Sequence, residues 1–210
     1  MLALAMSPHS SGLSVATQAA SRHRLAVHDT QDGQRERVER FIHAVYQARY
    51  GAQVRHYAPM LVSLRDEDDQ IIAAAGYRVA DTGPLFLERY LQQPVEVLLG
   101  QGSSQVQRTR IAEVGHLSAV QAGAGKRLIH LMGPQLAGLG LEWVVSTLTQ
   151  ELQHLFVRLG ITPLALGVAD AAQLGAAAAD WGSYYDHRPV VVAGRIDLAL
   201  RMLARRRSAA

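Results

Sequence analysis

The chain has 210 residues, and 49% of them are hydrophobic, a composition typical of a globular protein of one large domain or two small ones. It has no cysteine, which excludes a disulfide framework, a thiolate zinc site and a cysteine nucleophile. The formal net charge is only +3, so no electrostatic surface for nucleic acid is expected.

The same composition bears on location and organisation. No run of 18 or more apolar residues occurs, so we expect no transmembrane segment and a cytoplasmic protein. The nine histidines are scattered without the spacing of a metal site, and no metal is expected. Residues 1–23, rich in Ser, Ala, Thr and His, predict a mobile leader, and residues 24–210 predict a single domain.

Periodicity and turn residues predict the elements of the first half. Residues 24–28 favour a strand, and residues 34–50 carry apolar side chains at the i, i+3, i+4, i+7 spacing of an amphipathic helix, which Gly51 ends. Two β-like runs, 60–64 and 70–79, flank an acidic tip and predict a hairpin. Helix is expected again from residue 85, interrupted by Pro94.

The second half predicts further alternation of strands and helices. We expect strands at 109–117, 141–148, 161–168 and 188–192, and helices at 126–132, 150–159 and 194–207. Gly133-Pro134 should kink or end the first of these helices, and Thr147 with Gln150 fits a capping box for the second. The interleaved order predicts an α/β (α+β) fold with a mixed sheet covered by helices on both faces.

A Gly-rich turn joins the strand at 109–117 to the following helix, with the sequence Gln121, Ala122, Gly123, Ala124, Gly125, Lys126 and Arg127. Glycines allow close approach of backbone N–H groups, a helix N-terminus adds free donors, and two cations follow. Together these features fit a phosphate or pyrophosphate. The alternative is a tightly packed turn of small residues that binds nothing.

The element order and this turn resemble the GNAT superfamily of N-acyltransferases, in which a [QR]-x-x-G-x-[GA] turn binds the donor pyrophosphate. The resemblance implies a mostly antiparallel mixed sheet whose fourth and fifth strands splay apart to admit an acyl thioester. Here Gln121 stands one residue too close to the glycines, which moves the expected phosphate contacts to backbone amides and Lys126.

Longer strings are similar to the thermostable hemolysin family. They are Arg49–Ala52, Arg110–Leu117, Leu141–Val145 and Asp180–Pro189. That family is similar in outline to acyl-homoserine-lactone synthases and N-acyl amino acid synthases. The resemblance implies acyl transfer from an acyl-carrier-protein or coenzyme A thioester, with no metal. An acyl carrier protein and a small amine are the partners it suggests.

Glu113 and His116 precede the Gly-rich turn and are candidate catalytic residues. A carboxylate among β-like apolar neighbours is costly to bury unless it serves a site or a paired base, and burial would raise its pKa toward the range of a general base. For Glu113 the alternatives are an exposed carboxylate or a structural ion pair with Arg108 or Arg110. For His116 the alternative is a purely structural histidine. Strand alternation puts Glu113 and His116 on opposite faces unless a bulge intervenes.

The string around Trp181 supplies the other candidates. Tyr184 or Tyr185 is expected to protonate the leaving thiolate, a part that the GNAT resemblance suggests for a tyrosine, and Tyr185 is the candidate catalytic residue. Trp181, Tyr184 and Arg188 are candidates for binding the acceptor. Simple packing of the loop over the sheet is the competing interpretation for the aromatic residues.

We therefore predict an N-acyltransferase that moves a fatty acyl group to a small amine or amino acid. The acyl chain would enter the gap between the strands of Glu113 and Val144. Two alternatives remain open: a membrane-active lytic protein, for which the amphipathic helix near the C-terminus is the only modest candidate, and a non-catalytic module that binds acyl groups or lipid.

Overall fold

The computed structural model describes residues 23–100 and 105–208, so the expected leader lies almost wholly outside the described residues. The fold is built on a seven-stranded sheet in the order β1-β2-β3-β4-β5-β7-β6. All neighbouring strands are antiparallel except β4 and β5. The strands are β1 (Arg24–His28), β2 (Met60–Arg65), β3 (Ile71–Val79), β4 (Ile111–Ala119), β5 (Trp143–Leu148), β6 (Leu164–Val168) and β7 (Val190–Arg195).

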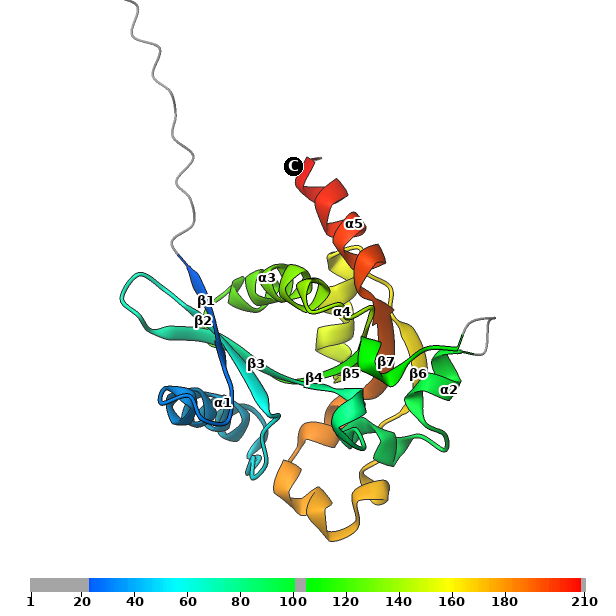
Figure 1. Ribbon diagram of the computed structural model, residues 1–210. Helices are drawn as coiled ribbons and strands as arrows, with labels where there is room; N and C mark the ends of the chain where they lie inside the picture. Colours follow the sequence, from blue (N-terminus) through cyan, green and yellow to red (C-terminus); the bar gives the residue numbers. More distant parts are fainter. Residues whose placement is uncertain (1–22, 101–104, 209–210) are drawn as a thin grey trace, which may run out of the picture.

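Helices cover both faces of the sheet (Figure 1), as the sequence predicts. The α-helices are α1 (Arg35–Tyr50), α2 (Val95–Leu99), α3 (Ala124–Gly138), α4 (Gln150–Arg158) and α5 (Ile196–Ser208). Short 3-10 helices are η1 (Ala80–Thr82), η2 (Phe86–Tyr90), η3 (Arg108–Arg110), η4 (Ala171–Trp181) and η5 (Tyr184–His187). The fold is therefore the expected mixed, mostly antiparallel α/β architecture.

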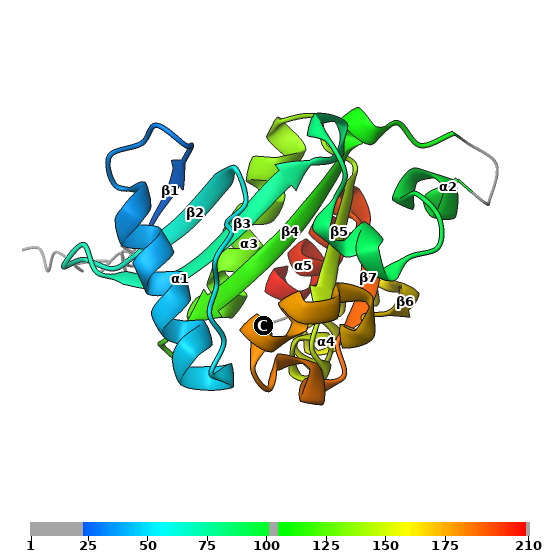
Figure 2. The same ribbon diagram turned by 90° about the horizontal axis from the view of Figure 1, so that it is seen from below.

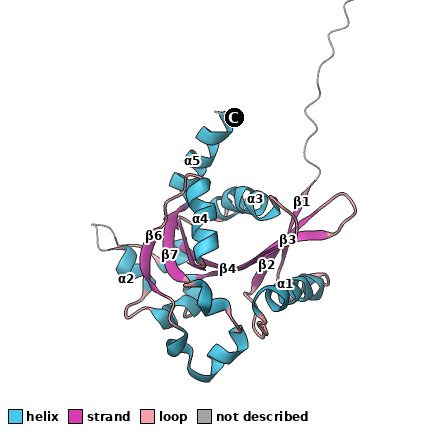
Figure 3. Ribbon diagram, turned by 180° about the vertical axis from the view of Figure 1, so that it is seen from behind, coloured by secondary structure: helices cyan, strands magenta, loops and turns pink. Residues whose placement is uncertain are grey.

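The two faces carry different elements. Helices α3, α4 and α5 share clusters of packed side chains on one face. Helix α1 packs with η5 on the other face, where η2, η4 and η5 also gather (Figure 2). The view from behind shows α3 and α1 on opposite sides of the strands (Figure 3).

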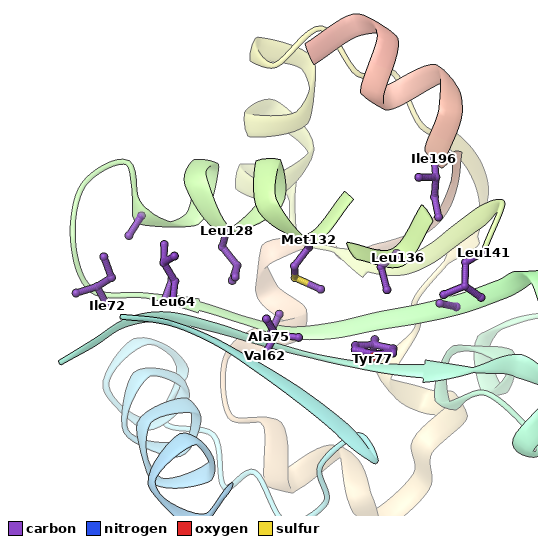
Figure 4. Close-up of a cluster of buried hydrophobic side chains, with 13 residues drawn as sticks. Val62, Leu64, Ile72, Ala75, Tyr77, Leu128, Met132, Leu136, Leu141 and Ile196 are labelled. Atoms are coloured by element: carbon purple, nitrogen blue, oxygen red, sulfur yellow. The ribbon is translucent and has the colours of Figure 1, made fainter. Parts of the chain in front are cut away.

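The core beneath α3 shows why this helix forms. Leu128, Met132 and Leu136 recur every four residues, and each is buried against β2, β3 and β4 (Figure 4). Burial of such side chains contributes about 1.5–3 kcal/mol each. The helix consequently continues through Gly133-Pro134, where the sequence predicted a kink or an end. Pro134 costs about 3 kcal/mol in a helix interior, which this packing offsets.

Another detail of the sequence prediction was wrong. Thr147 lies within β5, and the residue that precedes α4 is Thr149, whose side chain makes no capping hydrogen bond. The expected capping box between Thr147 and Gln150 is therefore absent, because the strand continues to Leu148. The break at Pro94 is confirmed, since η2 ends before it and α2 starts after it.

Strands β4 and β5 diverge soon after they meet. Their parallel pairing covers only Ile111–Glu113 against Trp143–Val145, although β4 continues to Ala119 and β5 to Leu148. Beyond the paired segment, the Ser146 hydroxyl donates a hydrogen bond of 2.7 Å to the Val114 carbonyl. The strands thus separate toward their carboxyl ends, next to the starts of α3 and α4.

Candidate active site

A bulge in β4 brings Glu113 and His116 to the same face. Opposite β3, the register moves from Gly76↔Gly115 to Ala74↔Ser118, so β4 holds one residue more than its partner. His116 lies in this bulge with φ of 56°, a left-handed conformation uncommon outside glycine. Val114 and Leu117 pack toward α3, whereas His116 faces the rings of Tyr46 and Tyr57 on the α1 side.

A cavity of about 1300 Å³ occupies the splay between β4 and β5. On the α1 side its lining includes Glu113, His116 and several aromatic rings. On the other side it is lined by apolar residues of the three helices there, namely Ile129, Met132, Leu136, Leu152, Phe156, Ala199, Leu200 and Leu203. The cavity thus joins a polar and aromatic half to an apolar half through the sheet.

Glu113 lines the cavity and also holds the start of η2. Its two carboxylate oxygens accept hydrogen bonds from the backbone N–H groups of Phe86 at 2.8 Å and Leu87 at 2.9 Å. Burial raises the pKa of Glu113, although these hydrogen bonds oppose the increase. A carboxylate has about four lone-pair sites, so Glu113 can still accept a proton from a bound ligand.

His116 is surrounded by aromatic side chains. Its ring centroid lies 5.7 Å from that of Tyr57 and 6.3 Å from that of Tyr46. Burial lowers the pKa of His116 to about 4, so the imidazole is neutral at physiological pH. A neutral imidazole can accept or share a proton inside the cavity.

The string after Trp181 forms an aromatic wall of the cavity. Trp181, Tyr184 and Tyr185 line it together, and the Tyr185 hydroxyl lies 2.5 Å from that of Tyr90. Burial raises the pKa of Tyr185, which keeps its proton available for donation. The Tyr184 hydroxyl donates to the Thr147 carbonyl at 3.4 Å, a contact that also serves packing.

Gly182 explains how this wall docks on α1. Its φ is 52°, and a Cβ atom there would overlap the Tyr50 carbonyl oxygen. That oxygen accepts a hydrogen bond of 2.8 Å from Ser183 N, while Gln53 N donates to the Asp180 carbonyl at 2.6 Å. Two of the strings that carried the family resemblance, near Tyr50 and near Trp181, thus meet in space.

The other predicted residues lie outside the cavity lining. Gln121–Arg127 forms the connection from β4 into α3, with Gly123 preceding the helix at φ of 81°. Ala124 N and Arg127 N bond to the Gln121 and Gly123 carbonyls, whereas the N–H groups of Gly125 and Lys126 belong to the first turn, which has no intrahelical acceptors. Arg188 is exposed and also lies outside the lining.

Several cavity residues escaped the sequence analysis. Arg78 is the cross-strand partner of Glu113, and Phe86, Arg89 and Tyr90 come from η2. The alternation of β3 puts Arg78 on the face of the sheet away from the core residue Tyr77, and this pattern could have indicated a cation that faces the cavity. The sequence predicted helix from residue 85 but not the position of η2 against the cavity, which depends on the hydrogen bonds to Glu113.

A second constellation resembles a hydrolytic triad but is closed to substrate. His28 Nε2 lies 2.9 Å from Ser63 Oγ, and His28 Nδ1 lies 3.3 Å from Asp32 Oδ1. Ser63 is fully buried, His28 is 3% exposed, and Arg65 also contacts the Ser63 hydroxyl. We therefore interpret this group as structural.

Comparison with known proteins identifies the family. The family model for thermostable hemolysin matches residues 28–200. The chain belongs to this family. The match spans strands β2 to β7, nearly all of the cavity lining and the aromatic wall, so it confirms the resemblance seen in the four strings. No curated protein is a significant match to the sequence.

Solved structures share the fold of this family member at low sequence identity. The acyl-homoserine-lactone synthase LasI has a TM-score of 0.58 at 12% identity, covering 86% of this chain and 95% of LasI. FeeM, an N-acyl amino acid synthase from uncultured soil microbes, has a TM-score of 0.56 at 11% identity, with coverages of 85% and 93%. MesI, a CoA-dependent acyl-homoserine-lactone synthase, has a TM-score of 0.53 at 13% identity, with coverages of 87% and 94%. The GNAT-like fold is thereby established.

Proposed function

We propose that this chain is an N-acyltransferase that moves a fatty acyl group from an acyl-carrier-protein or coenzyme A thioester to a small amine. The observation that carries the proposal is the cavity through the β4–β5 splay. It links an apolar space between the three helices to a half that holds acid–base groups. The solved synthases with this fold are named for acyl-homoserine-lactone and N-acyl amino acid products, which agrees with such a reaction.

The apolar half fits the acyl chain. Helices α3, α4 and α5 meet there through Ile129, Phe156 and Leu203, and no charged side chain of these helices lines the cavity among the described residues. An acyl chain placed there would bury about 0.8 kcal/mol per CH₂ group. The thioester would then lie in the splay, beside Val114 and Ser146.

The reaction needs two proton transfers. The amine nitrogen attacks the thioester carbonyl, the C–N bond forms, and the C–S bond breaks. In our proposal Glu113 receives the proton released by the amine, directly or through His116, and Tyr185 supplies a proton to the departing thiolate. Burial raises the pKa of Glu113, which suits a base, and Tyr185 keeps its proton at neutral pH and can therefore act as the donor.

The Gly-rich turn would hold the phosphate of the donor. It lies at the carboxyl end of β4, where the splay opens, and the free N–H groups of Gly125 and Lys126 lie at the positive end of the α3 dipole. A pantetheine arm could then run from this turn into the splay. Trp181 and Tyr184, on the α1 side, would contact the acceptor.

The proposal is tested by incubating purified protein with octanoyl-coenzyme A or octanoyl acyl carrier protein and a mixture of amines. We expect thiol release together with N-octanoyl products, identified by intact mass. The Glu113→Gln variant should release little thiol while still binding the donor, because an amide cannot take up the amine proton.

Glu113→Gln also places an NH₂ group near two backbone N–H donors, so its stability must be checked. We expect the free energy of unfolding to fall by about 1–3 kcal/mol. Glu142→Gln, an exposed carboxyl in an ion pair with Arg110 outside the cavity, is the matched control and should retain activity. Normal turnover by a folded Glu113→Gln protein would refute the assigned base, and absence of any N-acyl product in the wild type would refute the proposed function.

A further inference from the structure

The α1 side of the cavity holds cations without acidic partners. Most charged groups there are already paired: Arg35 with Glu39 at 2.8 Å, Arg55 with Asp180 at 2.9 Å, and Glu88 with Arg108 at 2.7 Å. Among the described residues, Arg78 and Arg89 form no close ion pair with a carboxylate, and Glu113 is the one lining carboxylate with no cation in ion-pair contact, although Arg78 acts on it electrostatically. In the described part of the chain, this half of the cavity thus has two guanidinium groups and one carboxylate outside close ion pairs.

Arg78 is the better placed of the two cations. It is half-buried and directly opposite Glu113 in the β3–β4 register, so the two side chains project to the same face. One Nη1 donor reaches the Pro84 carbonyl at 3.4 Å, which leaves most of its five N–H donors free. Arg89 is exposed, with its guanidinium 5.0 Å from the Phe86 ring centroid, at the rim of the same space.

The opposite charges of Glu113 on β4 and Arg78 on β3 suit the ammonium and carboxylate groups of a zwitterion. Cβ atoms of directly opposed residues lie about 4.5–5.5 Å apart, which suits groups attached to one carbon atom. An amine held near Glu113 and His116 would therefore bring an adjacent carboxylate within reach of Arg78. Arginine binds carboxylates in a bidentate manner, which fixes orientation as well as charge.

The surrounding rings complete the pocket. Phe86 and Trp181 have centroids 5.7 Å apart, and Tyr57 and Tyr185 line the same half. These walls favour an uncharged, apolar or aromatic side chain on the acceptor.

We propose that the acceptor is an α-amino acid with an uncharged side chain, whose carboxylate binds Arg78 with Arg89 at the rim. This inference rests on the proposed function and names the substrate class of the same site. The product would be an N-acyl amino acid, which keeps the negative charge of the carboxylate.

The experiment compares two mixtures with one donor thioester: the common α-amino acids, and the amines that correspond to them without the carboxylate. Products are identified by mass, and kcat and KM are then measured for the preferred amino acid and its decarboxylated counterpart. We expect the amino acid to be preferred. Arg78→Gln should lower kcat/KM for the amino acid by about 10–100-fold, mainly by raising KM. The kcat/KM for the decarboxylated amine should stay nearly unchanged.

Two further variants complete the experiment. Arg78→Lys should recover part of the preference, because the charge remains and the bidentate geometry does not. Arg40 is an exposed cation paired with Glu36 outside the cavity, so Arg40→Gln should leave kcat/KM unchanged for both substrates.

The inference is overturned if wild-type protein acylates the decarboxylated amines as well as the amino acids, or if Arg78→Gln lowers both equally. Either result would leave the proposed acyltransfer intact, since N-acyl products would still form. Failure of both mixtures to yield any product would instead reject the proposed function, and this inference with it.

Discussion

His116 is a partly buried titratable residue, with a buried Nδ1 atom, held in a strained backbone conformation. Its imidazole contacts the rings of Tyr46 and Tyr57, and the cation that acts on it electrostatically is Arg78. The left-handed φ and the burial both cost free energy, and the bulge is what places the ring in the cavity. Such an arrangement fits a residue kept for its position in a site.

The lowered pKa of His116 predicts a pH dependence of stability. In the unfolded chain His116 has its ordinary pKa of 6.5 and binds a proton below that pH. In the folded chain it binds this proton only near pH 4. Stability should therefore fall as pH drops through this window, by roughly 1.4 kcal/mol per pH unit from this residue. Urea unfolding at pH 7, 6 and 5 should show a steeper loss in wild type than in His116→Gln, and equal slopes would contradict the buried neutral imidazole.

Among the elements, the packing of α3 against α5 shapes the apolar half of the cavity. Gly133 lines the cavity, and a Cβ atom there would lie 3.0 Å from Leu200 Cδ2. A larger side chain at this position must therefore occupy cavity space or displace the flexible end of Leu200.

We expect Gly133→Leu to shorten the acyl chain that the protein prefers. The measurement is kcat/KM across a series of acyl thioesters, with a drop of about tenfold or more for the longest chains and little change for the shortest. Gly138→Leu is the matched control, because Gly138 lies in the same helix, outside the cavity lining, and a Cβ atom there would meet no other atom within 4 Å. An unchanged chain-length profile in Gly133→Leu would argue against acyl binding between α3 and α5.

For the molecule as a whole, the family name raises the question of lysis. Among the described residues, no helix is long and apolar enough to cross a membrane. An N-acyl amino acid, by contrast, is an anionic amphiphile, and a small molecule of this kind survives heating that unfolds a protein. The proposed reaction thus offers a route to heat-stable lysis through its product.

We expect purified protein without a thioester to release no dye from lipid vesicles. Lysis should appear when thioester and amine are both supplied, should be lost in Glu113→Gln, and should persist in the boiled, protein-free reaction mixture. Leakage caused by the protein alone would favour the lytic alternative instead.

Most elements of this fold could be predicted from the sequence, because their signals are local. The spacing of Val38 and Ile42 marked α1, Gly51 ended it at φ of 67°, and the acidic tip between two β-like runs marked the β2–β3 hairpin. Glu113 and Tyr185 were also singled out locally, as a carboxylate and a phenol in apolar or Gly-containing strings.

What these residues do together depends on the tertiary structure. The bulge puts His116 on the same face as Glu113. It depends on pairing with β3, where Gly76 lies 40 residues before His116 in the sequence. The course of α3 through Pro134 depends on burial against the sheet, and the position of Arg78 across from Glu113 depends on strand register. Long-range packing and register fix these features, and no local pattern encodes them, which is why the cavity and its Arg78 emerged only from the folded chain.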